Sequence, residues 1–280
     1  MLKFIGGTNY ISVSNYIKIL YSSSIIPIID YAKENSKNNN DVIKYDKEIT
    51  SVVSQINKQH FKNDIGYACK LTSYLPYNKE LYIDKFVKKV INTSHRNKYI
   101  FFDSEYSYLR QEEDYIFDKI IEKYQNIDNL YLFKTYQMYK KNSLNEIEKD
   151  IKKFDNIGIK LVRGAYYSYK NNELYKKKEQ TDENYNNGIN YLINNTNNKI
   201  CIATHNKYSI DYSLSLNPKD NVMYAQLLDM GDDLTMDLIE KKKTVFKYVP
   251  YGNIFDIYPY LVRRLYENVD MIKHISFKKF

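Results

Sequence analysis

Residues 159–166 end an apolar segment with side chains that could do chemistry. The Ile, Leu and Val residues of this segment predict a parallel strand that is buried on both faces. Lys160 and Arg163 offer positive charge, while Gly164 and Ala165 leave room for a flat or anionic group to approach the backbone. The segment therefore predicts the floor of a binding site. The alternative is an ordinary strand-to-helix turn with a surface arginine.

Polar residues also close the other apolar runs of the chain. If these runs are parallel strands of one barrel, their carboxyl ends meet at a single mouth, where barrel enzymes build their sites. Carboxylate, ammonium, guanidinium and imidazole groups would then surround one pocket. The residues are Asp30 and Glu34, Lys70 and Thr72, Asp103 and Glu105, Tyr136 and Gln137, Arg163 and Tyr166, Thr204, His205 and Asn206, Gln226, and Tyr248.

The triplet Thr204-His205-Asn206 ends one of these runs with three hydrogen-bonding side chains. One interpretation is a helix cap, in which Thr204 or Asn206 closes the next helix. The other is contact with a phosphate or an adenosine. His205 has no Cys or His at metal-ligand spacing, so we expect no metal site.

The C-terminal stretch 259–268 contains two adjacent arginines. Pro259 suits a first helical turn, and Glu267 lies three and four residues after Arg264 and Arg263, so that one carboxylate can orient both guanidinium groups. The stretch follows the last apolar run closely and is therefore aimed at the barrel mouth. Two arginines at this place suit bidentate binding of a carboxylate. The alternative is a surface helix with an isolated ion pair.

Eight apolar, β-branched or aromatic runs recur about every 30 residues, which is the length of a strand–helix unit. Polar stretches with helical spacing lie between them, including 80–90 and 112–121. This alternation predicts an α/β fold, a (βα)8 TIM-type barrel, with strands within about 25–249 and a last helix at about 256–268. We expect one domain over residues 1–280, a helix at Tyr10–Leu20 before the first strand, a loop at Asn35–Asn40 and a short C-terminal tail. The eight runs are Ile25–Ile29, Gly66–Leu71, Tyr99–Phe102, Leu130–Thr135, Ile157–Val162, Lys199–Ala203, Val222–Leu227 and Val245–Val249.

Composition excludes several classes of protein. The net charge of +8 accompanies an abundance of Tyr, Asn and Lys, which reflects A/T-rich codons, and no basic stripe interleaved with aromatic residues is present, so we expect no nucleic-acid partner. Cys69 and Cys201 each lie in an apolar run, which predicts buried thiols in a reducing compartment. No apolar run approaches the length of about 20 residues that a transmembrane helix needs. The first residues show neither a signal-peptide core nor a transit segment.

Several segments resemble the proline dehydrogenase family of flavin-dependent barrels, in family order over about residues 1–275. The basic-Leu-Val-basic-Gly-Ala-Tyr pattern of 160–166 is similar to the segment that runs under the FAD, and 203–206 resembles the sixth strand. Tyr-x-Pro-Tyr-Gly followed by Pro-Tyr-Leu-Val-Arg-Arg-x-x-Glu-Asn is similar to the eighth strand and helix. Shorter similarities lie at 29–34, 70–72, 102–105, 135–137 and 225–232.

The resemblance implies oxidation of L-proline to 1-pyrroline-5-carboxylate, the first step of proline catabolism, with electrons passed to a quinone or another acceptor. It implies one non-covalent FAD, held by Lys134, Gln137, Lys160, Arg163, Gly164, Ala165, Tyr166, Thr204, His205, Asn206 and Gln226. The residues that it assigns to catalysis are Lys70, Asp103, Tyr248, Arg263 and Arg264, with the arginine pair on the proline carboxylate. Glu267 would orient the arginines, and Asp30 and Glu34 would gate access by pairing with Arg263.

Tyr248 carries an expectation about specificity. In enzymes that the chain resembles, a tyrosine at this position packs over the substrate ring, and those that oxidise hydroxyproline tend to carry a small residue there. Two residues depart from the family pattern: Lys134 stands where the family has an amide near the flavin, and Asp229 replaces a glycine. Lys160 and Arg163 also vary in the family, since either cation can be the arginine.

Two other functions remain open from the sequence. One is a Schiff-base barrel lyase that uses Lys70 as its nucleophile. The other is a non-catalytic flavin- or amino-acid-binding barrel of the same descent, for which Lys134 and Asp229 are the best support. The resemblance implies a mitochondrial location with peripheral contact to the inner membrane, whereas the missing targeting segment favours the cytoplasm.

Overall fold

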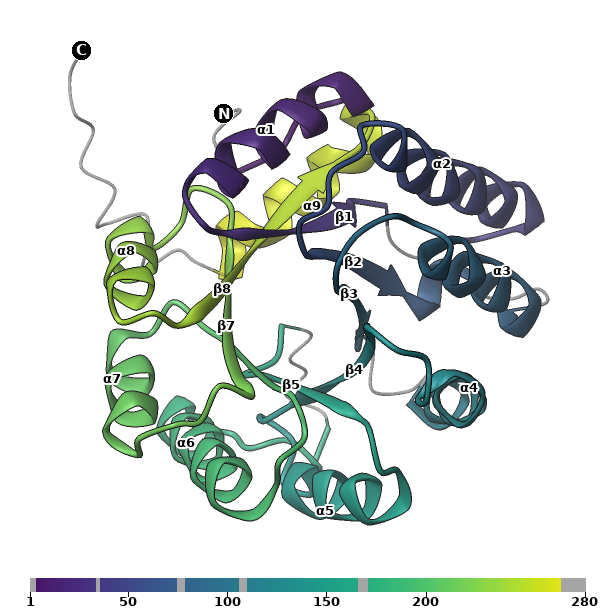
Figure 1. Ribbon diagram of the computed structural model, residues 1–280. Helices are drawn as coiled ribbons and strands as arrows, with labels where there is room; N and C mark the ends of the chain where they lie inside the picture. The colour runs from purple at the N-terminus through teal and green to yellow at the C-terminus, as the bar shows by residue number, and fades with distance from the viewer. Residues whose placement is uncertain (1–3, 34–35, 75–78, 106–109, 166–170, 268–280) are drawn as a thin grey trace.

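The computed structural model describes residues 4–33, 36–74, 79–105, 110–165 and 171–267; for residues 79, 110, 259, 260 and 263–267 it describes the backbone alone. Eight parallel strands close into a barrel in sequence order (Figure 1). This confirms the (βα)8 prediction. The strands are β1 (Ile26–Tyr31), β2 (Ile65–Lys70), β3 (Lys98–Asp103), β4 (Leu130–Gln137), β5 (Gly158–Val162), β6 (Ile200–Ala203), β7 (Val222–Leu227) and β8 (Thr244–Tyr251).

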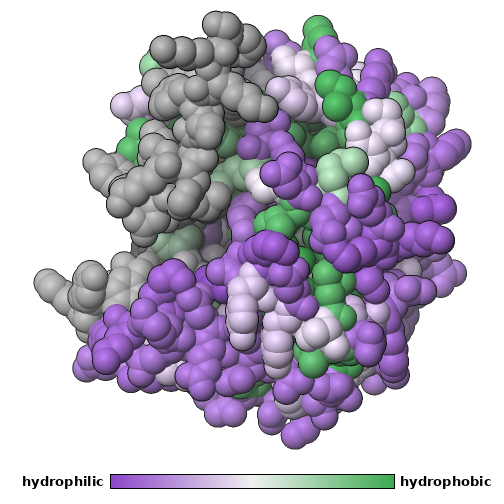
Figure 2. Space-filling model, turned by 90° about the vertical axis from the view of Figure 1, so that its left-hand side faces the viewer, coloured by the Kyte–Doolittle hydropathy of each residue, from purple (hydrophilic) through white to green (hydrophobic). Residues whose placement is uncertain are grey.

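Helices form a ring around the barrel and bury apolar side chains against the outer faces of the strands. On the face where α7 and α8 lie, hydrophilic residues dominate the described surface and hydrophobic ones occupy a narrow band between them (Figure 2). The helices are α1 (Tyr10–Ser22), α2 (Asn39–Asn57), α3 (Lys79–Ile91), α4 (Arg110–Tyr124), α5 (Ser143–Lys153), α6 (Lys178–Asn195), α7 (Lys207–Ser215), α8 (Asp232–Glu240) and α9 (Ile254–Glu267), and a 3-10 turn follows β2 at Leu71–Tyr74.

The interior of the barrel is filled by aromatic rings, so that it is a packed core and not a pore. Phe101 stacks on Phe133 with ring centroids 4.7 Å apart and meets Phe246 edge-on at 5.5 Å. Gly158 faces this layer, where a Cβ would lie 2.6 Å from the ring of Phe133. The absence of a side chain on β5 therefore makes room for the phenylalanine of β4. Cys201 lies inside the barrel, whereas Cys69 packs in the layer between the strands and the helices. Both thiols are free and buried, as expected.

The two terminal helices take different places. α1 packs against both β1 and β8 and so covers the seam where the barrel closes. α9 begins instead above the carboxyl end of β1: Ile257 packs with Ala32, which directly follows β1, and Asp256 accepts a hydrogen bond of 2.9 Å from Tyr31. The helix with the arginine pair thus starts at the barrel mouth.

The Asn-rich tract predicted as a loop ends earlier than expected. Asn38 accepts a hydrogen bond of 3.0 Å from the backbone N–H of Asp41, and α2 begins at Asn39. Asn suits this cap position because its side-chain oxygen satisfies one of the unpaired amides of a first helical turn. The loop prediction is therefore wrong for the end of the tract, and Asn35 lies outside the described residues.

A buried histidine at the amino-terminal end of the barrel predicts a dependence of stability on pH. Burial lowers the pKa of His95 from 6.5 to about 4. As the pH falls from 6.5 to 4, the unfolded chain takes up a proton that the folded chain does not. The free energy of unfolding should therefore decrease by about 2–3 kcal/mol as the pH falls from 6.5 to 4. Above this window the contribution of His95 to stability is complete and no longer changes with pH. Urea unfolding of wild type and His95→Gln at several pH values tests this: the difference between the two proteins should change with pH, and a constant difference would contradict the assignment.

Candidate active site

A cavity of about 340 Å³ opens at the carboxyl ends of the strands. Every strand or the residues directly after it contributes to its wall, as expected for the mouth of a barrel. The predicted residues that line it are Asp30, Lys70, Asp103, Glu105, Gln137, Lys160, Arg163, Gly164, Ala165, Thr204, His205, Gln226 and Tyr248. The structure therefore brings together side chains that are more than 200 positions apart in the chain.

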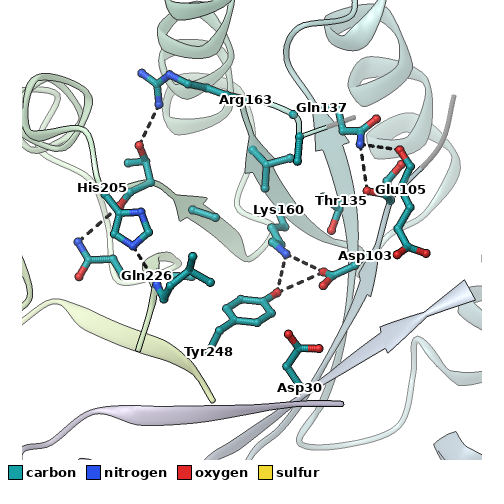
Figure 3. Close-up of a pocket in the computed structure, with 18 of the residues that line it drawn as sticks. Asp30, Asp103, Glu105, Thr135, Gln137, Lys160, Arg163, His205, Gln226 and Tyr248 are labelled. Carbon is teal, nitrogen blue, oxygen red and sulfur yellow. Dashed lines mark hydrogen bonds and ion pairs between the residues drawn. The ribbon is translucent and has the colours of Figure 1, made fainter. Parts of the chain in front are cut away.

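Lys160, Asp103 and Tyr248 point toward one another at the centre of the cavity (Figure 3). The Lys160 ammonium donates to Asp103 Oδ1 at 2.6 Å and to Tyr248 Oη at 2.5 Å. Tyr248 in turn donates to Asp103 at 3.2 Å, and the ammonium lies 4.6 Å above its ring. Burial and the neighbouring Asp103 carboxylate raise the pKa of Tyr248 well above its ordinary value. The phenol is therefore neutral near pH 7 and acts as a hydrogen-bond donor.

Lys70 forms a second buried ion pair. Its ammonium donates to Asp30 Oδ1 at 2.5 Å and to the carbonyl of Tyr31 at 2.6 Å. Lys70 reaches Asp30 because adjacent strands β1 and β2 place the two side chains side by side. The expected pairing of Asp30 with Arg263 stays a prediction, since the side chain of Arg263 lies outside the described residues. A Schiff-base nucleophile must be a neutral amine. The Lys70 nitrogen instead donates to a carboxylate and a carbonyl, an arrangement that gives the nucleophile role no support.

Arg163 is held at the flank of the cavity by groups from three elements. Its guanidinium donates to Asp182 on α6 at 2.5 Å, and to Thr204 and Ser209 at 2.9 Å each. The residue after it, Gly164, has φ 115°, and a Cβ there would lie 1.8 Å from the ring of Tyr139. Glycine is required at this position both by its backbone conformation and by its contact with the ring.

Within the Thr204-His205-Asn206 triplet after β6, one residue caps the next helix and another faces the cavity. Asn206 caps α7, since its side chain accepts a hydrogen bond of 3.0 Å from the N–H of Ser209. His205 faces the cavity and its Nε2 accepts from the backbone N–H of Leu227 at 2.9 Å. Among the described residues no group of His, Cys, Asp and Glu could hold a metal ion.

Strand β4 shows one wrong placement and one residue that the sequence missed. Lys134 points away from the cavity, into the helical layer, where it pairs with Asp150 at 2.6 Å and Asp114 at 2.9 Å. Its neighbour Thr135 faces the cavity beside Lys160, and its buried hydroxyl has no hydrogen-bond partner among the described residues. Because side chains alternate along a strand, Gln137 in the cavity implies Thr135 in the cavity. The signal in the sequence that could have placed Thr135 in the cavity was its position two residues before Gln137.

Some predicted residues fall outside the description. Glu34 and Tyr166 lie outside the described residues, and of Arg263, Arg264 and Glu267 only the backbone in α9 is described.

Asp229 has φ 55°, a left-handed conformation that favours glycine and is tolerated by aspartate. This explains how the chain accommodates its departure from the family pattern at this turn.

A closed (βα)8 barrel with a polar cavity at the carboxyl ends of its strands defines a barrel of the enzyme type. The model of one family, "Proline dehydrogenase", matches residues 13–276. The chain therefore belongs to the proline dehydrogenase family, as the sequence motifs imply.

Individual relatives agree with this assignment. The chain is 32% identical over 115 residues to proline dehydrogenase 1, mitochondrial, of Dictyostelium discoideum, a match over 36% of this chain and 20% of the relative. The match to proline dehydrogenase 1, mitochondrial, of Caenorhabditis elegans is 30% identical over 200 residues, or 62% of this chain and 32% of the relative. These matches thus span about a fifth and a third of the relatives' lengths.

A solved structure shows the same fold. Proline utilization A from Bdellovibrio bacteriovorus, inactivated by N-propargylglycine, superposes with a TM-score of 0.81 at 17% identity, over 95% of this chain and 32% of that one. Within the described residues, no helix has the length and apolar character needed to span a membrane.

Proposed function

We propose that this protein oxidises L-proline to 1-pyrroline-5-carboxylate with FAD as its cofactor. The observation that carries the proposal is the Lys160–Asp103–Tyr248 cluster at the centre of the mouth cavity, in a chain that matches the proline dehydrogenase family over residues 13–276. The mitochondrial relatives support a mitochondrial location. The resemblance to the family supports a quinone or another acceptor for the electrons.

The residues around the cavity fit a flavin. Gln137, Gln226 and His205 offer donors and acceptors for the ring system, and Gly164 and Ala165 let a flat group approach the backbone. Arg163, with Thr204 beside it, suits a phosphate. The hydroxyl of Thr135, which has no partner within the described part of the chain, is a further group that a bound cofactor can satisfy, because buried polar groups are rarely left without a partner. When bound, FAD accepts the hydride of the substrate.

Charge in the cavity explains why the arginine pair is needed. The described Lys and Arg side chains that line it are Lys70, Lys160 and Arg163, and each already pairs with a carboxylate, namely Asp30, Asp103 and Asp182. An anionic substrate therefore requires further positive charge in a partly desolvated site. Arg263 and Arg264 on α9, which starts at the mouth, would supply it by binding the proline carboxylate.

Lys160, Asp103 and Tyr248 then shape the other side of the substrate. The phenol keeps its proton and donates a hydrogen bond to Asp103, so the wall that it forms for the proline ring is neutral and apolar apart from its tip. The aromatic layer below, with Phe101 only 5.9 Å from the Lys160 ammonium, excludes water from the floor. These residues orient the ring and exclude solvent, which is what hydride transfer to a cofactor requires of a protein.

One spectrum tests the proposal. The purified protein, alone or after incubation with FAD, should show flavin absorption, and L-proline added without oxygen should bleach it. A protein that stays colourless would overturn the cofactor assignment. A flavin that proline does not reduce would favour a binding protein of the same descent.

Tyr248 should discriminate proline from 4-hydroxyproline. A phenol that is fixed by Lys160 and Asp103 leaves little volume for an added hydroxyl, and burial of that hydroxyl without a partner disfavours binding by about 1–3 kcal/mol. Tyr248→Ser should lower kcat/KM for proline and narrow the gap between the two substrates. The ratio of the two kcat/KM values in both proteins is the measurement. Wild-type preference for hydroxyproline, or a ratio that the substitution does not change, would contradict contact between Tyr248 and the ring.

A further inference from the structure

Lys247 is a buried lysine beside Tyr248 that the proposed mechanism does not use. Side chains alternate along β8, so Tyr248 faces the cavity while Lys247 faces outward, where only 2% of it is exposed. Its ammonium reaches the connection between β7 and α8. There it donates to the carbonyl of Met230 at 2.5 Å, to Asp232 Oδ1 at 2.9 Å and to the carbonyl of Leu227 at 3.3 Å.

This connection has an unusual backbone that needs fixing. Asp229 and Gly231 both have left-handed conformations, with φ of 55° and 62°. The Lys247 ammonium contacts the carbonyl of Leu227, two residues before Asp229, and the carbonyl of Met230, which lies between Asp229 and Gly231. It therefore holds the start and the middle of the turn together.

The turn also forms part of the cavity wall. Leu227 lines the cavity together with Gln226, and its backbone N–H donates to His205. Its carbonyl is the group that Lys247 contacts at 3.3 Å. The peptide groups on the two sides of Leu227 are thus held from the cavity by His205 and from the helical layer by Lys247.

A lysine is an unfavourable choice for a purely packing role at this place. Burial lowers the pKa of Lys247, which shows that its charge is partly desolvated. Asp232 is 65% exposed at its side chain, so the buried partners of the ammonium are the two carbonyls. Well-packed apolar residues often replace buried charged groups without loss of stability, so packing alone does not call for a lysine here, and its two carbonyl contacts point to a role in placing the backbone.

We propose that Lys247 is a positioning residue that holds the β7–α8 turn and thereby places Leu227 against the substrate and cofactor. This rests on the proposed oxidation of proline. Lys247→Met, which keeps the apolar stem and removes the donor, should lower kcat/KM for proline by about 10- to 100-fold, as expected for displacement of a cavity wall by about 1 Å. Amide hydrogen exchange of residues 228–232 should become faster in the same variant.

Lys243→Met is the matched control. Lys243 precedes β8 and donates to the carbonyl of Pro218 at 3.1 Å, at the opposite end of the barrel. The Lys243→Met variant therefore loses the same kind of hydrogen bond between a lysine and a carbonyl of a neighbouring element, but far from the cavity. We expect its kcat/KM and the exchange of residues 228–232 to match wild type. Asp232→Asn should also have a small effect, because both carbonyl contacts remain.

The outcomes separate this inference from the function on which it rests. A folded Lys247→Met protein with wild-type kinetics, or with wild-type exchange in the turn, overturns the positioning role. If Lys247→Met does not fold, Lys247→Gln, whose shorter and neutral side chain loses the reach to both carbonyls, decides: reduced kcat/KM with faster exchange of residues 228–232 in a folded protein supports the role, and wild-type values of both overturn it. If wild type itself does not oxidise proline, the proposed function fails, while exchange in the turn still reports whether Lys247 holds it.

Discussion

Replacement of Lys160 by Met should lower kcat/KM for proline by about 100- to 1,000-fold. The ammonium is the common donor to Asp103 at 2.6 Å and to Tyr248 at 2.5 Å, and no other cation contacts Asp103 among the described residues. Its removal leaves a carboxylate in the cavity without a counter-charge and frees the Tyr248 phenol, which we propose contacts the substrate ring. Steady-state kinetics with proline on the flavin-loaded variant measures the loss.

Lys134→Met is the control that separates chemistry from folding. Lys134 and Lys160 lie on adjacent strands, both are buried and both pair with a carboxylate at 2.6 Å, but Lys134 faces the helical layer. We expect Lys134→Met to unfold more easily and to keep near wild-type kcat/KM in its folded fraction. Adding Asp103→Asn to Lys160→Met should restore thermal stability without restoring activity. Equal losses of activity in the two lysine variants would show that Lys160 acts only on stability.

Arg264→Met should lower kcat/KM for proline by about 30- to 1,000-fold, which corresponds to about 2–4 kcal/mol for loss of a charge-assisted partner in a desolvated site. The described cations of the cavity are already paired, so the variant leaves the proline carboxylate without part of its counter-charge. Flavin content should fall much less than activity, because the residues that we propose as flavin contacts come from β4 to β7. Kinetics and the ratio of flavin to protein absorbance give both values.

Arg96→Met provides the comparison. Arg96 donates to Asp64 at 2.8 Å at the amino-terminal end of the barrel, so its loss removes an arginine–carboxylate contact far from the mouth. We expect wild-type kcat/KM from it. Wild-type kinetics in Arg264→Met as well would place the arginine pair on the surface.

The order and kind of the secondary-structure elements could be predicted from the sequence. Eight apolar runs at regular spacing specify alternating strands and helices, and eight such units favour a closed barrel over an open doubly wound sheet. Motifs at the ends of those runs identify the family and most of the residues around the cavity. The glycine within residues 160–166 also indicated the site from the sequence, and the structure gives the reason for it: a side chain at Gly164 would overlap the ring of Tyr139.

The direction of each side chain could not be predicted in the same way. A parallel strand between core and helices is apolar on both faces, so hydropathy alone does not show which side chains face the cavity, and the direction follows only from a residue already assigned to it, such as Gln137. Lys134 was therefore placed at the cofactor and Thr135 missed, although a shift of one residue moves a side chain to the other face of the sheet. Only the closed barrel shows that Lys134 contacts Asp150.

The partners of the charged groups were likewise decided by tertiary structure. Asp30 and Lys70 are 40 residues apart and Asp103 and Tyr248 are 145 apart, yet each pair meets because adjacent or facing strands end at one mouth. Arg163 finds Asp182 on α6 in the same way. The sequence by itself determined the barrel, the family and the residue types at the mouth. Which carboxylate neutralises which cation depends on distances of a few ångströms across the barrel, and these exist only once the strands have closed.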